Sequence, residues 1–244
     1  LPMTKRLALI DMGTNTFHIL ITEVDESGNR TDFVKTKLPV RLGQGGISKG
    51  AIAPEAYERA LKTLRDFRKQ IDEYDVETVR AMATSMVRNA SNGEDFIKDI
   101  YKQTDIQVEI IDGDREAELI YYGVRSADVL NEQTSLIMDI GGGSVEFIIC
   151  NNQEIFWKQS FEVGAQRLMD KFFSADPIPV AEVAAEKQFL TQQLQPLTNA
   201  VATYKPARLI GASVTFDTLC DIDALGRGDN ARQLSQPAAS TLEV

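Results

Sequence analysis

The chain has 244 residues, of which 43% are hydrophobic and 25% are charged. These values are ordinary for a globular protein that can build a core, and the length fits one large or two modest domains. The formal net charge of −10 argues against non-specific binding to nucleic acid, which normally uses a basic face.

The apolar runs and the cysteines exclude further classes of protein. No apolar run approaches the roughly 20 residues of a membrane-spanning helix, so we expect no membrane partner. Cys150 and Cys220 are far apart and have no metal-ligand spacing, so neither a disulfide framework nor a zinc site is predicted. No secretory signal is visible, and we expect a cytoplasmic protein.

The first half of the chain alternates between strand and helix patterns, which is typical of an α/β domain. Its clearest helix starts at Pro54, a favoured first-turn position, and has apolar residues at helical spacing. The glycine-rich stretch 41–50 is predicted to be an irregular loop. The expected strands are 7–11, 16–24, 31–40, 78–83 and 108–111, and the expected helices are 54–71, 92–101 and 115–129.

Asn131 and Glu132 mark the expected domain boundary, which gives a first domain of residues 1–130 and a second of residues 131–244. The second domain again opens with a strand, a glycine turn and a strand. Beyond these, we expect a strand over 155–161, helices over 165–173 and 180–194, a strand over 208–213 and a short helix over 214–220. The sequence then ends without a closing element, so the second domain is expected to lack its final elements.

A short repeat links the two halves. The segment 9–21, LIDMGTNTFHILI, aligns without a gap to 137–149, IMDIGGGSVEFII. Each copy reads as a strand, an Asp-x-Gly loop and a second strand. The alignment matches Asp11 with Asp139, Gly13 with Gly141, Thr16 with Ser144, and His18 with Glu146. A duplication of this kind predicts that both aspartates face one cleft between two domains of related topology.

The two loops suggest a phosphate site. Successive N–H groups in a glycine turn can form a concave anion-binding nest. An aspartate beside such a turn can hold hydrated Mg²⁺ next to phosphate oxygens. A single loop of this pattern could equally be a plain glycine-rich hairpin, and the second copy favours the phosphate site.

These motifs resemble the actin-like ATPase superfamily and, within it, most closely the exopolyphosphatase and guanosine pentaphosphate phosphohydrolase (Ppx/GppA) family. The resemblance runs from Leu7 to about Asp223. It implies two ribonuclease-H-like domains flanking a cleft, and we expect a homodimer. The further stretches that match are RLGQG (41–45), ATSMVRNASN (83–92), IIDGDREAELIYYGV (110–124) and FEVGAQRL (161–168).

The resemblance implies a phosphatase that removes terminal phosphates from inorganic polyphosphate or guanosine pentaphosphate, with Mg²⁺ or another divalent cation. Such hydrolysis needs a phosphate cradle, a cation, a positioned water and a proton acceptor. The predicted phosphate-binding residues are Gly13, Thr14, Asn15, Thr16, Arg88, Gly141, Gly142, Gly143 and Ser144. The predicted ligands of the metal or of its waters are Asp11, Asp139 and Glu146.

The proton acceptor is predicted from a second motif. The family's catalytic glutamate lies in a Gly-x-Glu-Glu-Ala-x motif at a helix start, and the matching stretch here is GDREAE, 113–118. Glu116, directly before the alanine, is the predicted general base. Arg115 replaces the commoner glutamate and Glu118 stands where arginine is often found, so Glu118 remains an alternative. A glutamate in a first helical turn can also be a surface residue stabilised by the helix dipole.

The cations matter because a net negative charge repels a polyanion, so the site must be locally basic or filled with Mg²⁺. The best basic candidates are Lys35, Lys37, Arg41 and Arg88. The two lysines are expected to be solvated, whereas Arg88 either clamps phosphate or lies on a helix surface. His18 is the only histidine, which argues against a Ser-His-Asp triad. It is predicted to contact phosphate or to pack beside the first loop.

Two alternative functions remain open. A small-molecule kinase of the same superfamily would need an adenosine pocket, but the third glycine motif, usually close to Gly-Gly-Thr, is here Gly211-Ala212-Ser213. A polyphosphate- or nucleotide-sensing module would bind without turnover, and the exchange at Arg115 is compatible with it.

Overall fold

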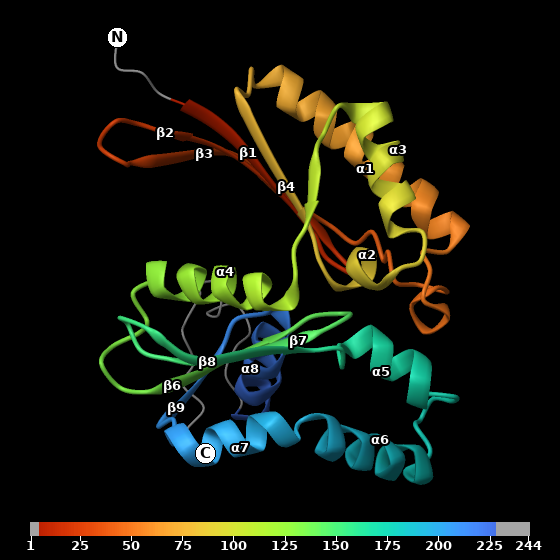
Figure 1. Ribbon diagram of the computed structural model, residues 1–244, viewed down its shortest axis with the longest axis vertical. Coiled ribbons are helices and arrows are strands. Elements are labelled where there is room, and N and C mark those ends of the chain that lie inside the picture. The colour runs from red at the N-terminus through yellow and green to blue at the C-terminus, as the bar shows by residue number, and fades with distance from the viewer. Residues whose placement is uncertain (1–4, 228–244) are drawn as a thin grey trace. The chain divides into compact units, whose positions relative to one another are not determined.

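The computed structural model describes residues 5–227, which form two compact units. Of the described residues, unit 1 comprises 5–112 and Met169–Lys171, and unit 2 comprises Gly113–Leu168 and 172–227. The sequence placed the change of domain at 130/131, whereas the contacts already group residues 113–126 with unit 2. Figure 1 traces the chain through both units.

Unit 1 is a five-stranded mixed sheet with helices packed on it (Figure 1). Its strand order is β3-β2-β1-β4-β5, in which β1 is antiparallel to β2 and parallel to β4. Its elements are β1 Lys5–Met12, β2 Phe17–Val24, β3 Arg30–Leu38, the 3-10 turn η1 Ile47–Lys49, α1 Pro54–Glu73, β4 Thr78–Ala83, α2 Ser85–Asn89, α3 Gly93–Thr104 and β5 Val108–Ile110.

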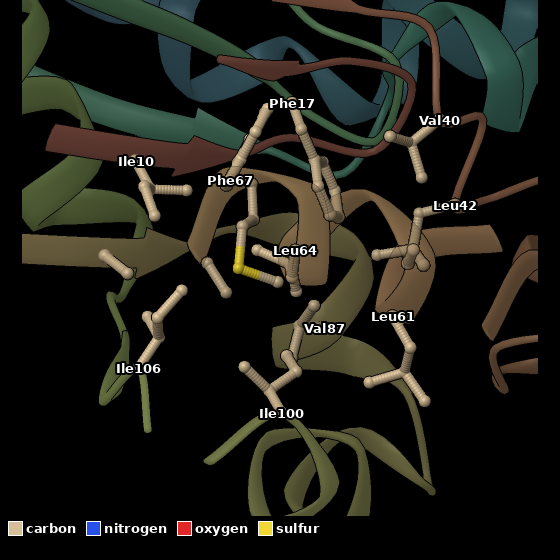
Figure 2. Packing of buried hydrophobic residues seen from close by; sticks show 14 of the residues in the cluster. Ile10, Phe17, Val40, Leu42, Leu61, Leu64, Phe67, Val87, Ile100 and Ile106 are labelled. Atoms are coloured by element: carbon tan, nitrogen blue, oxygen red, sulfur yellow. The ribbon is translucent and has the colours of Figure 1, made fainter. Parts of the chain in front are cut away.

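The core of unit 1 forms where α1 meets the sheet. Proline opens α1, and its apolar residues recur every three or four positions, so they share one face. That face is buried and includes Leu61, Leu64 and Phe67. These side chains pack with Ile10 and Phe17 from the first two strands (Figure 2). The helical periodicity in the sequence therefore identified the core face correctly.

Unit 2 is a four-stranded sheet with strand order β8-β7-β6-β9. Strand β6 is antiparallel to β7 and parallel to β9. Its elements are α4 Gly113–Ser126, β6 Ser135–Ile140, β7 Val145–Cys150, β8 Ile155–Phe161, α5 Ala165–Phe172, α6 Val180–Gln193, α7 Gln195–Tyr204, β9 Arg208–Gly211 and α8 Val214–Arg227.

Strand β7 is buried along its whole length. On one face, Ile148 and Cys150 pack against Ala117 and Tyr121 of α4. On the other face, Val145 and Phe147 pack in a second hydrophobic cluster with side chains of α6 and α7. Burial on both faces explains why the strand is an almost continuous apolar run rather than an alternating one.

The two sheets share one topology. In unit 1, β1 pairs with the antiparallel β2 on one side and the parallel β4 on the other, and β3 pairs antiparallel with β2. In unit 2, β6 pairs in the same way with β7 and β9, and β8 pairs antiparallel with β7. The register also agrees, because Asp11 pairs with His18 across β1 and β2, and Asp139 pairs with Glu146 across β6 and β7. The expected α/β class with two ribonuclease-H-like (actin-like) domains is confirmed, and so is the relation between the two copies.

Three elements were missed from the sequence. Helix α2 follows β4 directly, where only a strand end at 84–85 was expected. Helix α7 was unassigned, although Pro196 occupies a first-turn position that favours a helix start. The loop 41–50 contains the short turn η1. Residues 228–244, on which the expected loss of final elements partly rests, lie outside the described residues.

Within residues 5–227, no helix is both long enough and apolar enough to cross a membrane.

The core of unit 1 yields a stability prediction. Phe67→Ala should lower the free energy of unfolding of unit 1 by roughly 3–5 kcal/mol, because it leaves a cavity in a close-packed interior. Urea dependence of amide hydrogen exchange in α1 measures this locally. Tyr101→Ala is the control, since that ring is 48% exposed, and it should change the value little. Equal losses for both variants would contradict the assigned core.

Candidate functional site

The second glycine loop, residues 141–144, is held by the segment that follows β8. The N–H of Gly164 donates to the carbonyl oxygen of Gly143 at 3.2 Å. The N–H groups of Ala165 and Gln166 donate to the carbonyl oxygens of Gly141 and Gly142, both at 2.9 Å. Three successive carbonyls of the loop therefore face the start of α5.

This arrangement fixes where the loop amides point. In a planar trans peptide the C=O and the following N–H point in opposite directions. Since the carbonyls of residues 141–143 face α5, the N–H groups of Gly142, Gly143 and Ser144 face away from it. Successive N–H groups on one side of a turn can donate to an anion such as phosphate. The downstream hydrogen bonds thus explain the direction of these amides, and their binding of phosphate stays a prediction.

Close backbone contacts limit the space for a Cβ at two glycines. A Cβ on Gly164 would lie 2.5 Å from backbone atoms of Gly142 and Gly143, so only glycine fits against the loop. Gly141 donates its N–H to the carbonyl of Ser144 at 3.0 Å and has little room for a Cβ. These contacts make the loop a tightly stacked turn rather than a flexible one.

Arg167 adds a side-chain contact to the same loop. Its Nε donates to the carbonyl oxygen of Gly143 at 3.1 Å, and its Nη2 pairs with Glu162 at 2.9 Å. The guanidinium therefore steadies the peptide between Gly143 and Ser144. Sequence reasoning missed this residue, although it lies in the FEVGAQRL stretch (161–168).

The first loop is held in the same way in unit 1. The N–H of Arg41 donates to the carbonyl of Asn15 at 2.7 Å, and that of Gly43 donates to Thr14 at 3.0 Å. By the same peptide geometry, the N–H groups of Asn15 and Thr16 face away from this segment. The RLGQG stretch is thus the counterpart of the Gly164 segment, an equivalence that the aligned 13 residues did not reveal.

A row of polar side chains crosses the sheet of unit 2 beside the loop. Asp139, Glu146 and Ser160 are direct cross-strand neighbours on β6, β7 and β8, so they share one face. Glu146 is only 2% exposed, and Ser160 Oγ donates to its Oε1 at 2.7 Å. Gly113 packs against Ser160 so closely that a Cβ would lie 2.4 Å from the serine Cβ. The first turn of α4 therefore lies directly on this row.

The electrostatics of this row centre on Glu146. Burial raises the pKa of Glu146 to about 8, and the nearby charge of Glu116 adds to the rise. Hydrogen bonds from Ser160 and Ser144 oppose it, and Asp139 adds a smaller rise. Ser144, two residues before Glu146, therefore lies on the same side of the chain as this carboxylate. The structure thus brings Glu116, Asp139 and Glu146 into one acidic cluster.

The two candidate bases on α4 differ in their partners. Glu118 binds Lys158 Nζ at 2.5 Å and Arg115 Nη1 at 3.1 Å. The hydrogen bond from Lys158 is the main cause that lowers the pKa of Glu118. Glu116 lies close enough to the buried Glu146 to interact with it electrostatically. A carboxylate held in ion pairs is a poorer proton acceptor, so the two ion pairs of Glu118 argue against Glu118 as the base.

Arg115 and Glu118, whose charges are exchanged relative to the family motif, contact each other in the structure. Arg115 and Glu118 form an i,i+3 ion pair, so the acid and the base have traded places within one pair. The swap leaves the net charge of the helix start unchanged.

The corresponding row in unit 1 carries different chemistry. Asp11, His18 and Lys37 are cross-strand neighbours on β1, β2 and β3. His18 Nδ1 lies 3.5 Å from Asp11 Oδ2, and these side chains are 45% and 52% exposed. His18 therefore lies beside the first loop, next to its aspartate. Lys35 and Lys37 are exposed, as expected.

The side chain of Arg88 is partly buried and contacts the backbone of another segment. It lies on α2, is half-buried, and its Nη1 donates to the carbonyl oxygen of Ile111 at 2.9 Å. It thereby secures the chain just before α4 begins. Its predicted contact with phosphate stays a prediction.

The acidic cluster fits a divalent cation by its chemistry. Carboxylate oxygens are the hard ligands that Mg²⁺ prefers, and a buried carboxylate crowded by two others is stabilised by a cation. Within residues 5–227, no group of three or more acidic, histidine or cysteine side chains is placed so that it could hold a metal ion by itself. Mg²⁺ commonly keeps several waters and takes phosphate oxygens as further ligands, so the residues present fit such an ion.

The predicted site residues thus fall into two groups. Unit 1 holds Asp11, Gly13, Thr14, Asn15, Thr16 and Arg88, and unit 2 holds Glu116, Asp139, Gly141, Gly142, Gly143, Ser144 and Glu146. Their roles toward phosphate and metal stay predictions. Sequence reasoning missed Gly113, Ser160, Gly164 and Arg167, three of which lie in stretches already noted for their family resemblance.

Comparison with known proteins gives consistent matches. The model of the Ppx/GppA phosphatase family matches residues 20–237. The chain is 38% identical over 173 residues to a bifunctional 3-dehydroquinate synthase/phosphatase of Fusobacterium nucleatum, which covers 68% of the chain and 26% of that protein. It is 29% identical over 215 residues to exopolyphosphatase 1 of Mycobacterium bovis, covering 88% of the chain and 62% of that protein.

A solved structure agrees with these matches. The crystal structure of an exopolyphosphatase from Cytophaga hutchinsonii superposes with a TM-score of 0.87 and 48% identity, over 93% of this chain and 72% of that one. The chain spans less than two thirds of the length of the two curated relatives.

The buried glutamate yields a pH prediction. A pKa raised from 4.5 to about 8 means that the folded state binds the proton more tightly. The contribution of this proton to stability is complete below about pH 4.5 and is lost as the pH rises toward 8. In chelator, the free energy of unfolding of unit 2 should therefore fall between pH 5 and 8.

The sole tryptophan, Trp157, lies in β8 and reports this unfolding by fluorescence. Glu146→Gln should flatten the pH dependence, because its side chain does not titrate. Glu154→Gln, at an exposed glutamate in the turn between β7 and β8, is the control and should keep the wild-type slope. If the slopes of wild type and Glu146→Gln coincide, the buried proton is not the cause.

Proposed function

This chain belongs to the Ppx/GppA phosphatase family, and we propose that it hydrolyses the terminal phosphoanhydride bond of inorganic polyphosphate, guanosine pentaphosphate or both. One observation carries the proposal. The β6–β7 turn directs three amides to one side, and the same strand ends hold the carboxylates of Asp139 and Glu146. An anion cradle beside an acidic cluster is what phosphoryl transfer to water requires.

In the proposed reaction, the amides of the second glycine loop, residues 142–144, bind the oxygens of the terminal phosphate. A water oxygen attacks the terminal phosphorus, the bridging P–O bond breaks, and Glu116 accepts the proton from the water. The shortened chain leaves with the electron pair of the bridging oxygen. Loop amides fixed in advance stabilise the charge on the transferred group without reorganising during the reaction.

We propose Mg²⁺, or another divalent cation, as the cofactor. In unit 2, Asp139 and Glu146 would hold the ion or its waters, and in unit 1 the role of Asp11 as a ligand of a metal or of its waters stays a prediction. The bound cation would neutralise charge on the phosphate oxygens. The clustering of Glu116, Asp139 and Glu146 supports this role, since these charges repel one another in its absence.

Polyphosphate is proposed as the first substrate to test, since relatives of this chain are exopolyphosphatases. The third glycine motif supports this choice over a kinase. A Cβ on Gly211 would lie 2.0 Å from Phe216 Cγ, so an aromatic ring covers the loop. Ser213 Oγ accepts the N–H of Ile140 at 3.1 Å, which ties this loop to β6. Both contacts lie at the third glycine motif, where the resemblance to the superfamily leads us to expect the adenosine pocket of a kinase.

The second candidate function is a sensing module without turnover. Such a module would bind polyphosphate or a nucleotide but would release no phosphate from it. The exchange at Arg115 no longer favours it, because the Arg115–Glu118 pair compensates the charges. The expected homodimer and the cytoplasmic location stay predictions.

Glu116→Gln tests the general base. The substitution keeps the size of the side chain but removes the proton acceptor, so kcat for polyphosphate should fall by about 10²–10⁴. KM should stay level or decrease, because a negative charge near the phosphates disappears. Release of inorganic phosphate from long-chain polyphosphate measures both constants.

Glu118→Gln is the matched control. It makes the same chemical change two residues on, at a carboxylate committed to Lys158, and activity should persist. An inactive Glu118→Gln beside an active Glu116→Gln would reassign the base. Full activity in both would replace the carboxylate-base mechanism by one in which the phosphate or the cation activates the water.

The charge of the protein yields a binding prediction. Because a chain of net charge −10 must hold a polyanion, binding as well as catalysis should require Mg²⁺. Calorimetric titration of Glu116→Gln with polyphosphate avoids turnover. The affinity should fall by about tenfold or more when excess Mg²⁺ is replaced by chelator. Equal affinities would mean that side-chain cations suffice.

A further inference from the structure

Arg41 has a backbone conformation that is unusual for a residue with a side chain. Its φ is +52°, in the left-handed region where residues with a Cβ are disfavoured. The other described non-glycine residues with positive φ follow helices, where a left-handed residue commonly ends the helix, and they are Asp75, Asp105, Asp128 and Lys205. Arg41 instead follows a strand, beside the first glycine loop.

The backbone of Arg41 is bound on both sides. Its N–H donates to the carbonyl of Asn15 at 2.7 Å, and its own carbonyl accepts Arg59 Nη2 at 3.0 Å. Arg59 Nε also donates to the carbonyl of Val40. These bonds hold the left-handed turn against the first loop. A conformation maintained by its surroundings at such a cost is typical of functional sites.

The side chain of Arg41 is exposed. In the part of the chain that the structure describes, its guanidinium has no hydrogen bond or ion pair. The strain therefore does not serve an internal contact of the side chain. It leaves an unneutralised cation at the edge of the first loop, in a protein of net charge −10.

The second unit shows that the loop itself does not need this cation. Gly164 occupies the equivalent place and makes the equivalent bond, from its N–H to the carbonyl of Gly143. There a Cβ would collide with the loop backbone. Unit 1 thus carries an arginine at a position where the same hydrogen bond is made by glycine in its copy.

We propose that Arg41 is a substrate-binding residue whose guanidinium binds the phosphate group adjacent to the one held by the first glycine loop. A planar guanidinium matches two phosphate oxygens and adds a positive charge, which the neutral loop amides lack. The inference rests on the proposed function and names a residue that distinguishes a phosphate chain from a single phosphate.

The test separates charge from backbone conformation. Arg41→Gln removes the charge but keeps the Cβ, and KM for long-chain polyphosphate should rise about tenfold, with kcat changed less than about twofold. Arg41→Lys should recover part of the loss. Arg41→Gly should raise KM as Arg41→Gln does, yet unfold at higher temperature, because glycine adopts this φ without strain. The difference in KM should shrink at high salt.

Lys62→Gln, on an exposed position of α1, makes the same change of charge away from the loop and should keep the wild-type KM. A wild-type KM for Arg41→Gln would overturn the inference, as would a wild-type KM for Arg41→Gly. If wild type with Mg²⁺ hydrolyses polyphosphate while these variants match it, only this inference fails. If wild type neither hydrolyses nor binds it, the proposed function fails as well.

Discussion

Hydrogen bonds from the segment after β8 to the carbonyls of the second glycine loop are the constraint on which the candidate site depends. They turn three peptide planes the same way, so the amides of residues 142–144 share one direction. They also require glycine at 164, because the two backbones touch. The Gly-Gly-Gly sequence permits this turn, but the residues that determine its orientation lie about 20 positions later.

The same scaffold occurs twice with different side chains. In unit 1, the row across the strands reads Asp11, His18 and Lys37, and in unit 2 it reads Asp139, Glu146 and Ser160. The first row adds groups that can carry positive charge, and the second adds carboxyl and hydroxyl groups. The two units therefore share the backbone geometry of this row and differ in the charge of its side chains.

Much of the fold could be predicted from the sequence because its signals are local. Spacing along α1 identified the core face, and the Asp-x-Gly repeat identified both hairpins and the pairing of their strands. The domain boundary was not predictable in this way, since α4 joins unit 2 through Ala117 and Tyr121, which look like any amphipathic helix face. In the site, the contact of Gly113 with Ser160 joins residues that are distant in the sequence, and a single sequence carries no record of such pairs.

The ion pair between Arg115 and Glu118 restricts how this motif can change over time. With glutamate at both positions, the first turns of α4 would hold repelling carboxylates near Glu116. With arginine at both, Lys158 would lose its partner and face two cations. Neither single replacement is neutral, so the exchange requires an uncharged intermediate or a paired change. In related sequences, positions 115, 118 and 158 should therefore vary together, and the identity of any one of them is informative only beside the other two.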